Sequence, residues 1–426
     1  MEVIKLEVKK SEVHNSEVKK FEAQPSEAQQ SEVHSSPLYL DYCATTPIRP
    51  EVAQAIARTI EQIYGNPSSL HQAGRAAKKT LEAARETFAQ LLTAKPSEIL
   101  FTATGTEANN LAILGALKHP DLVGCHVITT VIEHPAVKNA FRELESRGHS
   151  VTYLPVNEQG VVQVEDFVDA LRPDTRFVSV MMANNETGAL QPVNEIAQIC
   201  RGRGIVMHSD AVQAFGKVPI SVNDLPVDLL SLSAHKVYGP KGVGILYVKR
   251  RTKLFPVLFG GGQEKGLRSG TENVALVHGA AAAARMAVEE MGQEMERLKS
   301  LRDELQKRIL DTVENVRITC PTVPVLPHVL HLTVADVLGE TVLLELDREG
   351  ICVSAGSACS SGSAEPSPVL QAMNVPDRFI HGSLRISLGK DTTQKDLDRF
   401  VDTFAKVVAQ FRNMLPSSFP PIPTGV

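Results

Sequence analysis

Between residues 98 and 248 the sequence alternates short apolar runs with amphipathic helical segments, and this alternation limits the fold more than any other feature. The apolar runs contain few charged residues, which is typical of strands that are buried on both faces. We expect seven strands, at Glu98–Thr102, His126–Thr130, Val151–Leu154, Phe177–Met182, Ile205–His208, Leu229–Ser233 and Gly244–Val248. Such a pattern predicts an α/β fold with a mostly parallel seven-stranded sheet flanked by helices. In these sheets ligands bind at the carboxyl ends of the strands.

The rest of the chain predicts a second, smaller domain. A long helical pattern without proline covers residues 274–316, and after about residue 328 short strands and helices resume. We expect a large domain at 38–290 and a smaller α+β domain at 291–415. Residues 38–50 are expected to pack with the small domain.

The two ends of the chain have unusual composition. Residues 1–37 place a Glu followed by Val or Ala every five residues, a period that matches neither a helix nor a strand. We therefore expect 1–37 to be a disordered repetitive tail. Residues 416–426 are rich in proline and are expected to be loose.

Charge and composition exclude several classes of function. The net charge is −5, Trp is absent and aromatic residues are 5% of the chain, which argues against a nucleic-acid partner. No run of apolar residues is long enough to cross a membrane, so no membrane association is expected. The N-terminal segment lacks the apolar stretch of a secretory signal, which predicts a cytoplasmic protein.

Three motifs that follow predicted strands contain chemically useful side chains. They are Thr104-Gly-Thr-Glu107, His208-Ser-Asp-Ala-Val-Gln213 and Ser233-Ala-His-Lys236. Each alone has an ordinary explanation: a helix-capping turn, a capping aspartate and a solvated lysine. Together they favour pyridoxal phosphate, which needs a lysine for covalent attachment, an acid beside its ring nitrogen and a phosphate site at a helix N-terminus.

The chain from about Leu38 to Phe411 also resembles a known family. The motifs are Leu40-Asp-Tyr-Cys-Ala-Thr-Thr-Pro47, Gly65-Asn-Pro-Ser-Ser-Leu-His71, Thr104-Gly-Thr-Glu107, Glu133-His-Pro-Ala-Val137, Asn184-Asn-Glu-Thr-Gly188, Asp210-Ala-Val-Gln213, Ser233-Ala-His-Lys236, Arg268-Ser-Gly-Thr271, Ser354-Ala-Gly-Ser-Ala-Cys-Ser360 and Ser383-Leu-Arg-Ile-Ser-Leu-Gly389. In this order they resemble the group I cysteine desulfurases. These enzymes belong to the class V aminotransferase superfamily, which has the pyridoxal-phosphate fold type I.

The resemblance implies a role for each matching residue. Lys236 would bind the cofactor covalently, and His134 would stack on its ring and move protons. The other cofactor-binding residues implied are Asp210 at the ring nitrogen, Gln213 at the phenolic oxygen, and Gly105, Thr106, Ser233, His235 and Thr271 at the phosphate. Thr271 would come from a neighbouring subunit, which implies a homodimer. Asn185 and Arg385 would hold the substrate carboxylate, a role that suits the planar guanidinium.

Cys359 decides which reaction the sequence predicts. It lies in Ser354-Ala-Gly-Ser-Ala-Cys-Ser-Ser-Gly-Ser363, a segment without bulky side chains that is expected to be mobile. A nucleophile that must travel explains a cysteine there better than an incidental exposed thiol does. Ala355 stands where the family often has Ser, a mild departure because both are small.

The predicted reaction removes sulfur from L-cysteine, giving L-alanine and a persulfide on Cys359. By resemblance, the sulfur passes to an iron–sulfur scaffold or another acceptor protein, for cluster assembly or thiolation. No resident metal is expected, although Cys359 could bind a transferred iron–sulfur cluster. The sequence does not name the acceptor pathway, nor decide on activity with selenocysteine.

Two alternatives remain open at the level of sequence. One is a pyridoxal-phosphate cysteine or cystine lyase, or an aminotransferase, of the same superfamily, which would not need Cys359. The other is a non-catalytic scaffold on this fold, which the presence of Lys236, Asp210 and His134 disfavours.

Overall fold

The computed structural model describes residues 37–355 and 365–414. The predicted tail, apart from Pro37, and the predicted proline-rich end lie outside the described residues. Their disorder therefore stays a prediction.

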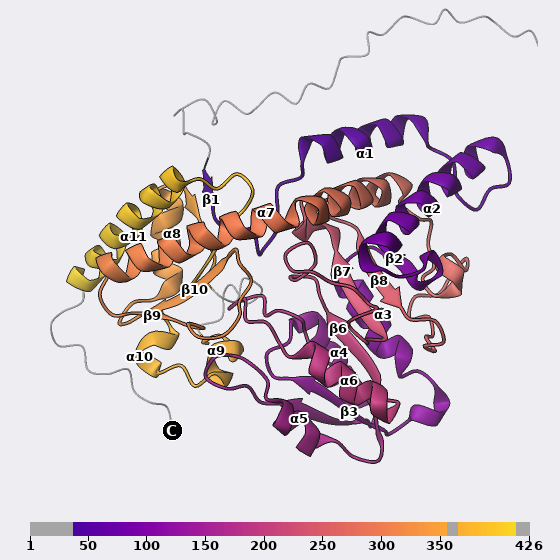
Figure 1. Ribbon diagram of the computed structural model, residues 1–426, viewed down its shortest axis with the longest axis horizontal. Coiled ribbons are helices and arrows are strands. Elements are labelled where there is room, and N and C mark those ends of the chain that lie inside the picture. Colours follow the sequence, from indigo (N-terminus) through magenta and orange to yellow (C-terminus); the bar gives the residue numbers. More distant parts are fainter. Residues whose placement is uncertain (1–36, 356–364, 415–426) are drawn as a thin grey trace, which may run out of the picture. The chain divides into compact units, whose positions relative to one another are not determined.

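A seven-stranded sheet lies at the centre of residues 99–248 (Figure 1). Its strands are β2 (Ile99–Thr102), β3 (His126–Thr130), β4 (Ser150–Leu154), β5 (Thr175–Ser179), β6 (Val206–Asp210), β7 (Leu229–Ser233) and β8 (Gly244–Val248). They lie in the order β2-β8-β7-β6-β5-β3-β4, and β8 runs antiparallel to both of its neighbours while the others share one direction. The predicted mostly parallel seven-stranded sheet is confirmed.

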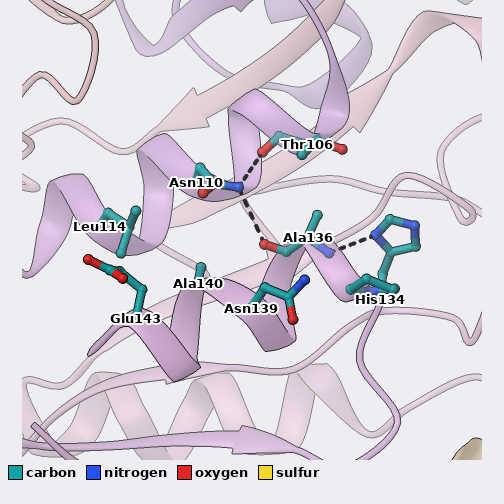
Figure 2. A pocket seen from close by; sticks show the side chains of 9 residues that line it. Thr106, Asn110, Leu114, His134, Ala136, Asn139, Ala140 and Glu143 are labelled. Atoms are coloured by element: carbon teal, nitrogen blue, oxygen red, sulfur yellow. Dashed lines mark hydrogen bonds between the residues drawn. The ribbon is translucent and has the colours of Figure 1, made fainter. Parts of the chain in front are cut away.

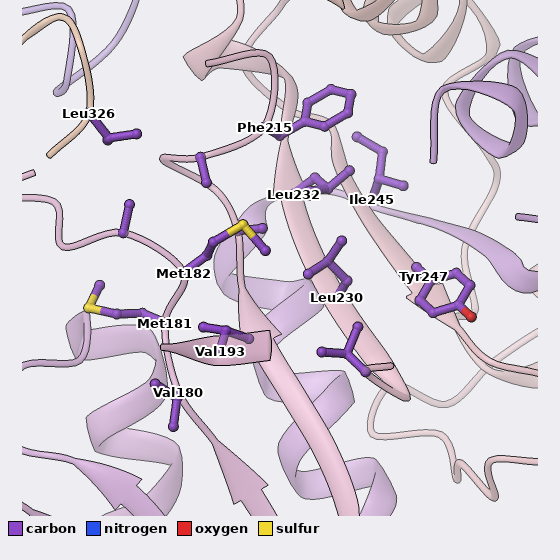
Figure 3. Packing of buried hydrophobic residues seen from close by; sticks show 14 of the residues in the cluster. Val180, Met181, Met182, Val193, Phe215, Leu230, Leu232, Ile245, Tyr247 and Leu326 are labelled. Carbon is purple, nitrogen blue, oxygen red and sulfur yellow. The ribbon is translucent and has the colours of Figure 1, made fainter. Parts of the chain in front are cut away.

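The strands are apolar on both faces because each face is covered by helices. Along β7, Leu229 packs into one core, while Leu230 and Leu232 pack into the other. The helices on the Leu229 face are α3 (Gly105–Ala116) and α4 (Pro135–Ser146). The helices on the opposite face are α2 (Gln72–Leu92), α5 (Val164–Ala170), α6 (Val193–Arg203) and α7 (Val274–Thr312). Figure 3 shows Leu230 and Leu232 in the core of that second face, together with Phe215.

The helix α7 is one continuous element of 39 residues (Figure 1). Near its start, Gly279 lies against Ile56 of α1 (Pro50–Gln62), so closely that a Cβ on Gly279 would meet that side chain. Toward its end, Arg308 forms an ion pair with Asp398 of α11 (Gln394–Met414). The predicted domain boundary at residue 290 falls inside this helix, and the division into two domains stays a prediction.

A second sheet follows α7, with its own apolar core. Its strands, in the order β12-β10-β9, are β9 (Val316–Ile318), β10 (Val329–Val334) and β12 (Ser383–Ser387). The helices of this region are α8 (Gly339–Arg348), α9 (Pro368–Ala372), α10 (Asp377–Ile380) and α11. A parallel pair joins β1 (Leu38–Tyr39) to β11 (Ile351–Cys352), which connects the start of the described chain to its C-terminal part.

The elements that the sequence pattern did not indicate are short. They are β1, β9, α10 and the 3₁₀ helices η2 (Pro96–Glu98), η3 (Pro120–Leu122), η4 (Ala234–Lys236) and η5 (Glu264–Gly266). Elements of two to four residues contain at most about one helical turn or two strand periods, which is too short for a repeating pattern to be recognised.

Among the described residues, none of the helices combines the length and apolar character that a membrane span requires.

Candidate active site

The predicted site residues follow strands that end at the same edge of the seven-stranded sheet. Thr104 comes two residues after β2, and His134 comes four residues after β3. Asp210 and Ser233 are the last residues of β6 and β7. Because these four strands share one direction, their carboxyl ends bring all four positions to one edge.

Lys236 ends η4, directly after β7. Its Nζ donates hydrogen bonds to the backbone carbonyl oxygens of Cys43 at 2.6 Å and Ala44 at 2.8 Å. The side chain of Gln213 donates to the same Cys43 carbonyl at 3.0 Å. The segment at 43–44 therefore holds the predicted attachment lysine and Gln213 side by side.

Asp210 is a buried carboxylate held by neutral donors. Its Oδ2 accepts from Nδ2 of Asn109 at 2.6 Å, and its Oδ1 accepts from the backbone N–H of Val212 at 2.9 Å. Both of these donors are neutral groups. A buried carboxylate that accepts from neutral donors suits a positively charged group of a ligand.

Asn109 is a site residue that the sequence reasoning missed. It lies four residues after Gly105, so it is on the same face of α3, one turn into the helix. Its Oδ1 is buried without a hydrogen-bond partner. The available signal was the pair Asn109-Asn110 in the otherwise apolar run Ala108–Ala116, but capping and burial patterns alone do not identify the partner of Asn109.

His134 is the N-cap of α4, and its Nδ1 accepts a hydrogen bond from the backbone N–H of Ala136 at 3.1 Å (Figure 2). Burial lowers the pKa of His134 from its ordinary value; the Asp210 carboxylate opposes this shift and the Lys236 ammonium adds to it. The imidazole is therefore close to both residues and is neutral near pH 7. Since Nδ1 accepts, the proton of the neutral ring lies on Nε2.

Three of the residues predicted to bind phosphate, Gly105, Thr106 and Ser233, lie at the N-terminus of α3. A Cβ placed on Gly105 would lie 3.2 Å from Cβ of Ser233, so the first turn of α3 is in contact with the end of β7. Thr106 and His134 both line a pocket of about 470 Å³ (Figure 2). Free N–H groups and the helix dipole favour an anion at this position.

His235 completes this group as a neutral side chain. Its Nδ1 lies 3.1 Å from Oγ1 of Thr45. Burial, together with the nearby Lys236 and Lys241 ammonium groups, lowers its pKa to about 4. At neutral pH it can therefore offer one ring N–H without adding a charge.

Arg385 of β12 is buried and makes two polar contacts. Its Nη1 donates to the backbone carbonyl oxygen of Asn185 at 2.6 Å, and its Nη2 donates to Oδ1 of Asp41 at 2.7 Å. Its Nε is buried without a partner. The two predicted carboxylate-binding residues, Arg385 and Asn185, are therefore in contact through the main chain of Asn185. Asp41 is a further residue of this group, which the sequence did not indicate.

Two predicted residues are not joined to this group. Thr271 is exposed, and no hydrogen bond among the described residues connects it to the other predicted site residues. Cys359 lies outside the described residues. Their predicted roles therefore have no geometric test within the described part of the single chain.

The residues present fit pyridoxal phosphate. The ring nitrogen of this cofactor is a cation when protonated. It therefore matches the carboxylate of Asp210, which accepts its hydrogen bonds from neutral groups. An amine at Lys236 and a helix N-terminus at Gly105 meet its two other chemical needs. The site therefore matches the cofactor at three independent points: its ring nitrogen, its covalent attachment and its phosphate.

Comparisons with known proteins identify the same chemistry. The model of the family described as aminotransferase class-V matches residues 38–400. A "Cysteine desulfurase IscS" of Dictyoglomus turgidum is 45% identical over 379 residues, covering 89% of this chain and 96% of the relative.

Solved structures agree with the sequence match. A structure described as "NIFS-like protein" superposes with a TM-score of 0.83 at 37% identity, covering 88% of this chain and 100% of that one. Another, "SspA in complex with cysteine", has a TM-score of 0.73 at 35% identity and covers 82% of this chain and 98% of that one.

Proposed function

This chain belongs to the aminotransferase class-V family and is a cysteine desulfurase, and from this premise we propose how its residues divide the work. The observation on which the proposal depends is the convergence of Lys236, Asp210 and His134 at one edge of the sheet. The substrate is L-cysteine, and the products are L-alanine and sulfur held on the enzyme as a persulfide.

Family membership implies dependence on pyridoxal phosphate, and the site residues suit its parts. Lys236 would hold the cofactor covalently through Nζ, and Asp210 would pair with its ring nitrogen. The remaining cofactor-binding residues are Gln213 at the phenolic oxygen and Gly105, Thr106, Ser233 and His235 at the phosphate. When bound, the cofactor supplies an electron sink for the pair left on the α-carbon of the substrate.

Lys236 and His134 have different roles in the reaction. His134 uses Nδ1 as an acceptor for the Ala136 N–H, so its neutral ring has a proton on Nε2 and no free lone pair. It therefore donates a hydrogen bond from Nε2 and is not the base. The base that removes the α-proton is then Nζ of Lys236, which is half-buried and close to the same ring.

The substrate carboxylate is assigned to Arg385 and Asn185. Arg385 is 2% exposed, so a carboxylate that reaches its guanidinium is bound away from bulk water. Asn185 is half-buried next to it, with its carbonyl oxygen already fixed by Nη1.

The sulfur transfer is assigned to the thiolate of Cys359. It forms an S–S bond to the substrate sulfur while the Cβ–S bond breaks. The electron pair of that bond stays with the carbon fragment, which is protonated and leaves as alanine. The support is the segment around Cys359 and the desulfurase relatives, because Cys359 lies outside the described residues.

The partners follow from the same assignment. Exposed Thr271 is proposed to complete the phosphate site of a second copy, which makes the enzyme a homodimer. Sulfur would pass from Cys359 to an iron–sulfur scaffold or another acceptor protein, in keeping with the IscS relatives. A cytoplasmic location also stays a proposal.

Mass spectrometry of the enzyme after brief mixing with L-cysteine tests this function. We expect one added sulfur atom on Cys359 and one alanine per sulfur transferred. Cys352, the half-buried thiol of β11, is the matched control, and Cys352→Ala should keep the modification. Sulfide release at the parental rate from Cys359→Ala would instead indicate a lyase.

A further inference from the structure

The carboxylate of Asp41 pairs directly with the guanidinium of Arg385. The ion pair is well shielded, with the Asp41 side chain 17% exposed and that of Arg385 3% exposed. Charge-assisted hydrogen bonds of this kind are the strong ones and fix the plane of a guanidinium. The position of Asp41 therefore determines how Arg385 is oriented.

The backbone on both sides holds this ion pair in register. Asp41 pairs with Ser387 of β12, and the N–H of Ser387 donates to the carbonyl oxygen of Leu40 at 2.8 Å. Tyr39 adds a second restraint, since its hydroxyl donates to the carbonyl oxygen of Asp41 at 2.9 Å. Asp41 and Arg385 are thus presented to each other by paired main-chain segments.

The distribution of contacts leaves one part of the guanidinium for a ligand. A guanidinium has five N–H donors, and here one on Nη1 is used by Asn185 and one on Nη2 by Asp41. The N–H of Nε is buried and has no acceptor, which costs free energy unless a ligand supplies one. A carboxylate has two acceptor oxygens and binds such a fork with Nε and one Nη.

We propose that Asp41 is a positioning residue of the substrate-carboxylate site. By holding Nη2 it fixes Arg385 so that the N–H of Nε stays available to the carboxylate of cysteine. The proposal rests on the desulfurase function and goes beyond it by naming the residue that orients the substrate-binding arginine. Asp41 does not touch the substrate and acts through Arg385.

Steady-state kinetics of Asp41→Ala with two substrates test the proposal. We expect KM for L-cysteine to rise about tenfold, the equivalent of about 1.4 kcal/mol, with kcat changed by less than about twofold. Asp41→Asn should return KM to within about threefold of the wild type, because its Oδ1 accepts the same hydrogen bond. Turnover of cysteamine, which lacks the carboxylate, should be the same in wild type and both variants.

A binding measurement and a matched ion pair provide the controls. The dissociation constant of L-alanine, followed through the visible absorbance of the bound cofactor, should rise with KM in Asp41→Ala. Asp336 and Arg378 form an ion pair whose side chains are 50% and 54% exposed, and Asp336→Ala should leave KM unchanged. Persulfide formation in the wild-type enzyme is a separate measurement, and it decides whether the desulfurase function holds.

Two results would overturn the positioning role. One is an unchanged KM for L-cysteine in Asp41→Ala, and the other is an equal loss of activity with cysteamine, which would show general damage to the fold. If Asp41→Ala does not fold, Asp41→Glu replaces it. The extra methylene keeps the charge but moves the acceptor, so KM should rise at least about threefold, and an unchanged KM overturns the proposal.

Discussion

The two charged anchors of the site are built in opposite ways. Asp210, at the end of β6 in the seven-stranded sheet, accepts hydrogen bonds from two neutral groups, the amide of Asn109 and the N–H of Val212. Arg385, in β12 of the second sheet, already has an anionic partner in Asp41. Asp210 therefore keeps a charge that a permanently bound cation can neutralise, whereas Arg385 is neutralised before the substrate arrives. The difference matches a cofactor that stays and a substrate that must leave.

Lys236 should give the largest effect, because it is the proposed attachment point of the cofactor and the proposed base. Its Nζ donates to Cys43 and Ala44, which follow Asp41 by two and three residues. Lys236→Ala removes both the covalent attachment and the base, so desulfurase activity should fall by at least about 10⁴-fold. Alanine formation from L-cysteine measures the loss, together with the visible absorbance of bound cofactor. Activity within about tenfold of the wild type would contradict the assignment.

Asp210→Asn should give the next largest effect, and it directly tests the role of the negative charge on Asp210. Asparagine has nearly the same shape but does not stabilise a protonated ring nitrogen, so kcat should fall by about 10²–10³-fold. The comparison with Asp41→Asn is the informative one, because that substitution should change KM by no more than about threefold. Equal losses of kcat in both variants would remove the distinction between the two anchors.

The sequence predicted the strand-end residues better than their supports. Asp210, Ser233 and Lys236 follow buried apolar strands, and a parallel sheet brings such positions to one edge whatever the details of packing. Asn109 and Asp41 were missed because their roles depend on partners 101 and 344 residues away in the chain. No periodicity contains that information, since it arises from how helices and sheets pack together.

Asn109→Ala should have a smaller effect than Asp210→Asn. The hydrogen bond from Asn109 orients Asp210 but is not the charge itself, and a hydrogen bond to a charged group contributes about 1.5–3 kcal/mol. We therefore expect a loss of cofactor affinity of about tenfold or more, measured by titrating the cofactor into the apoenzyme. Asn194→Ala, an exposed position on α6, is the control. Unchanged affinity in Asn109→Ala would show that the hydrogen bond from the N–H of Val212 is enough to orient Asp210.

The smallest expected effect is at Glu133. This residue contrasts most clearly with Asp210, since it is a buried carboxyl that is kept neutral. Its Oε1 accepts from the N–H of Met181 at 2.7 Å, while its Oε2 is buried without a partner. Burial raises its pKa to about 8, so the folded state keeps a proton that the unfolded state loses above about pH 4.5. Stability should therefore be lost as pH rises from about 5 to 8.

Glu133→Gln should remove this part of the pH dependence with little effect on activity. Glutamine retains the acceptor for Met181 and resembles the protonated acid in shape and charge. Relative to the wild type, the variant should gain stability with rising pH, by about 1.4 kcal/mol per pH unit at most, because one proton is involved. Thermal unfolding of both proteins at several pH values measures this gain, and Glu51→Gln in α1 reports the general effect of removing one exposed acid. Parallel curves of stability against pH for the wild type and Glu133→Gln would mean that Glu133 is ionised in the folded enzyme. The contrast with Asp210 would then fail, because Glu133 would be a second charged carboxylate.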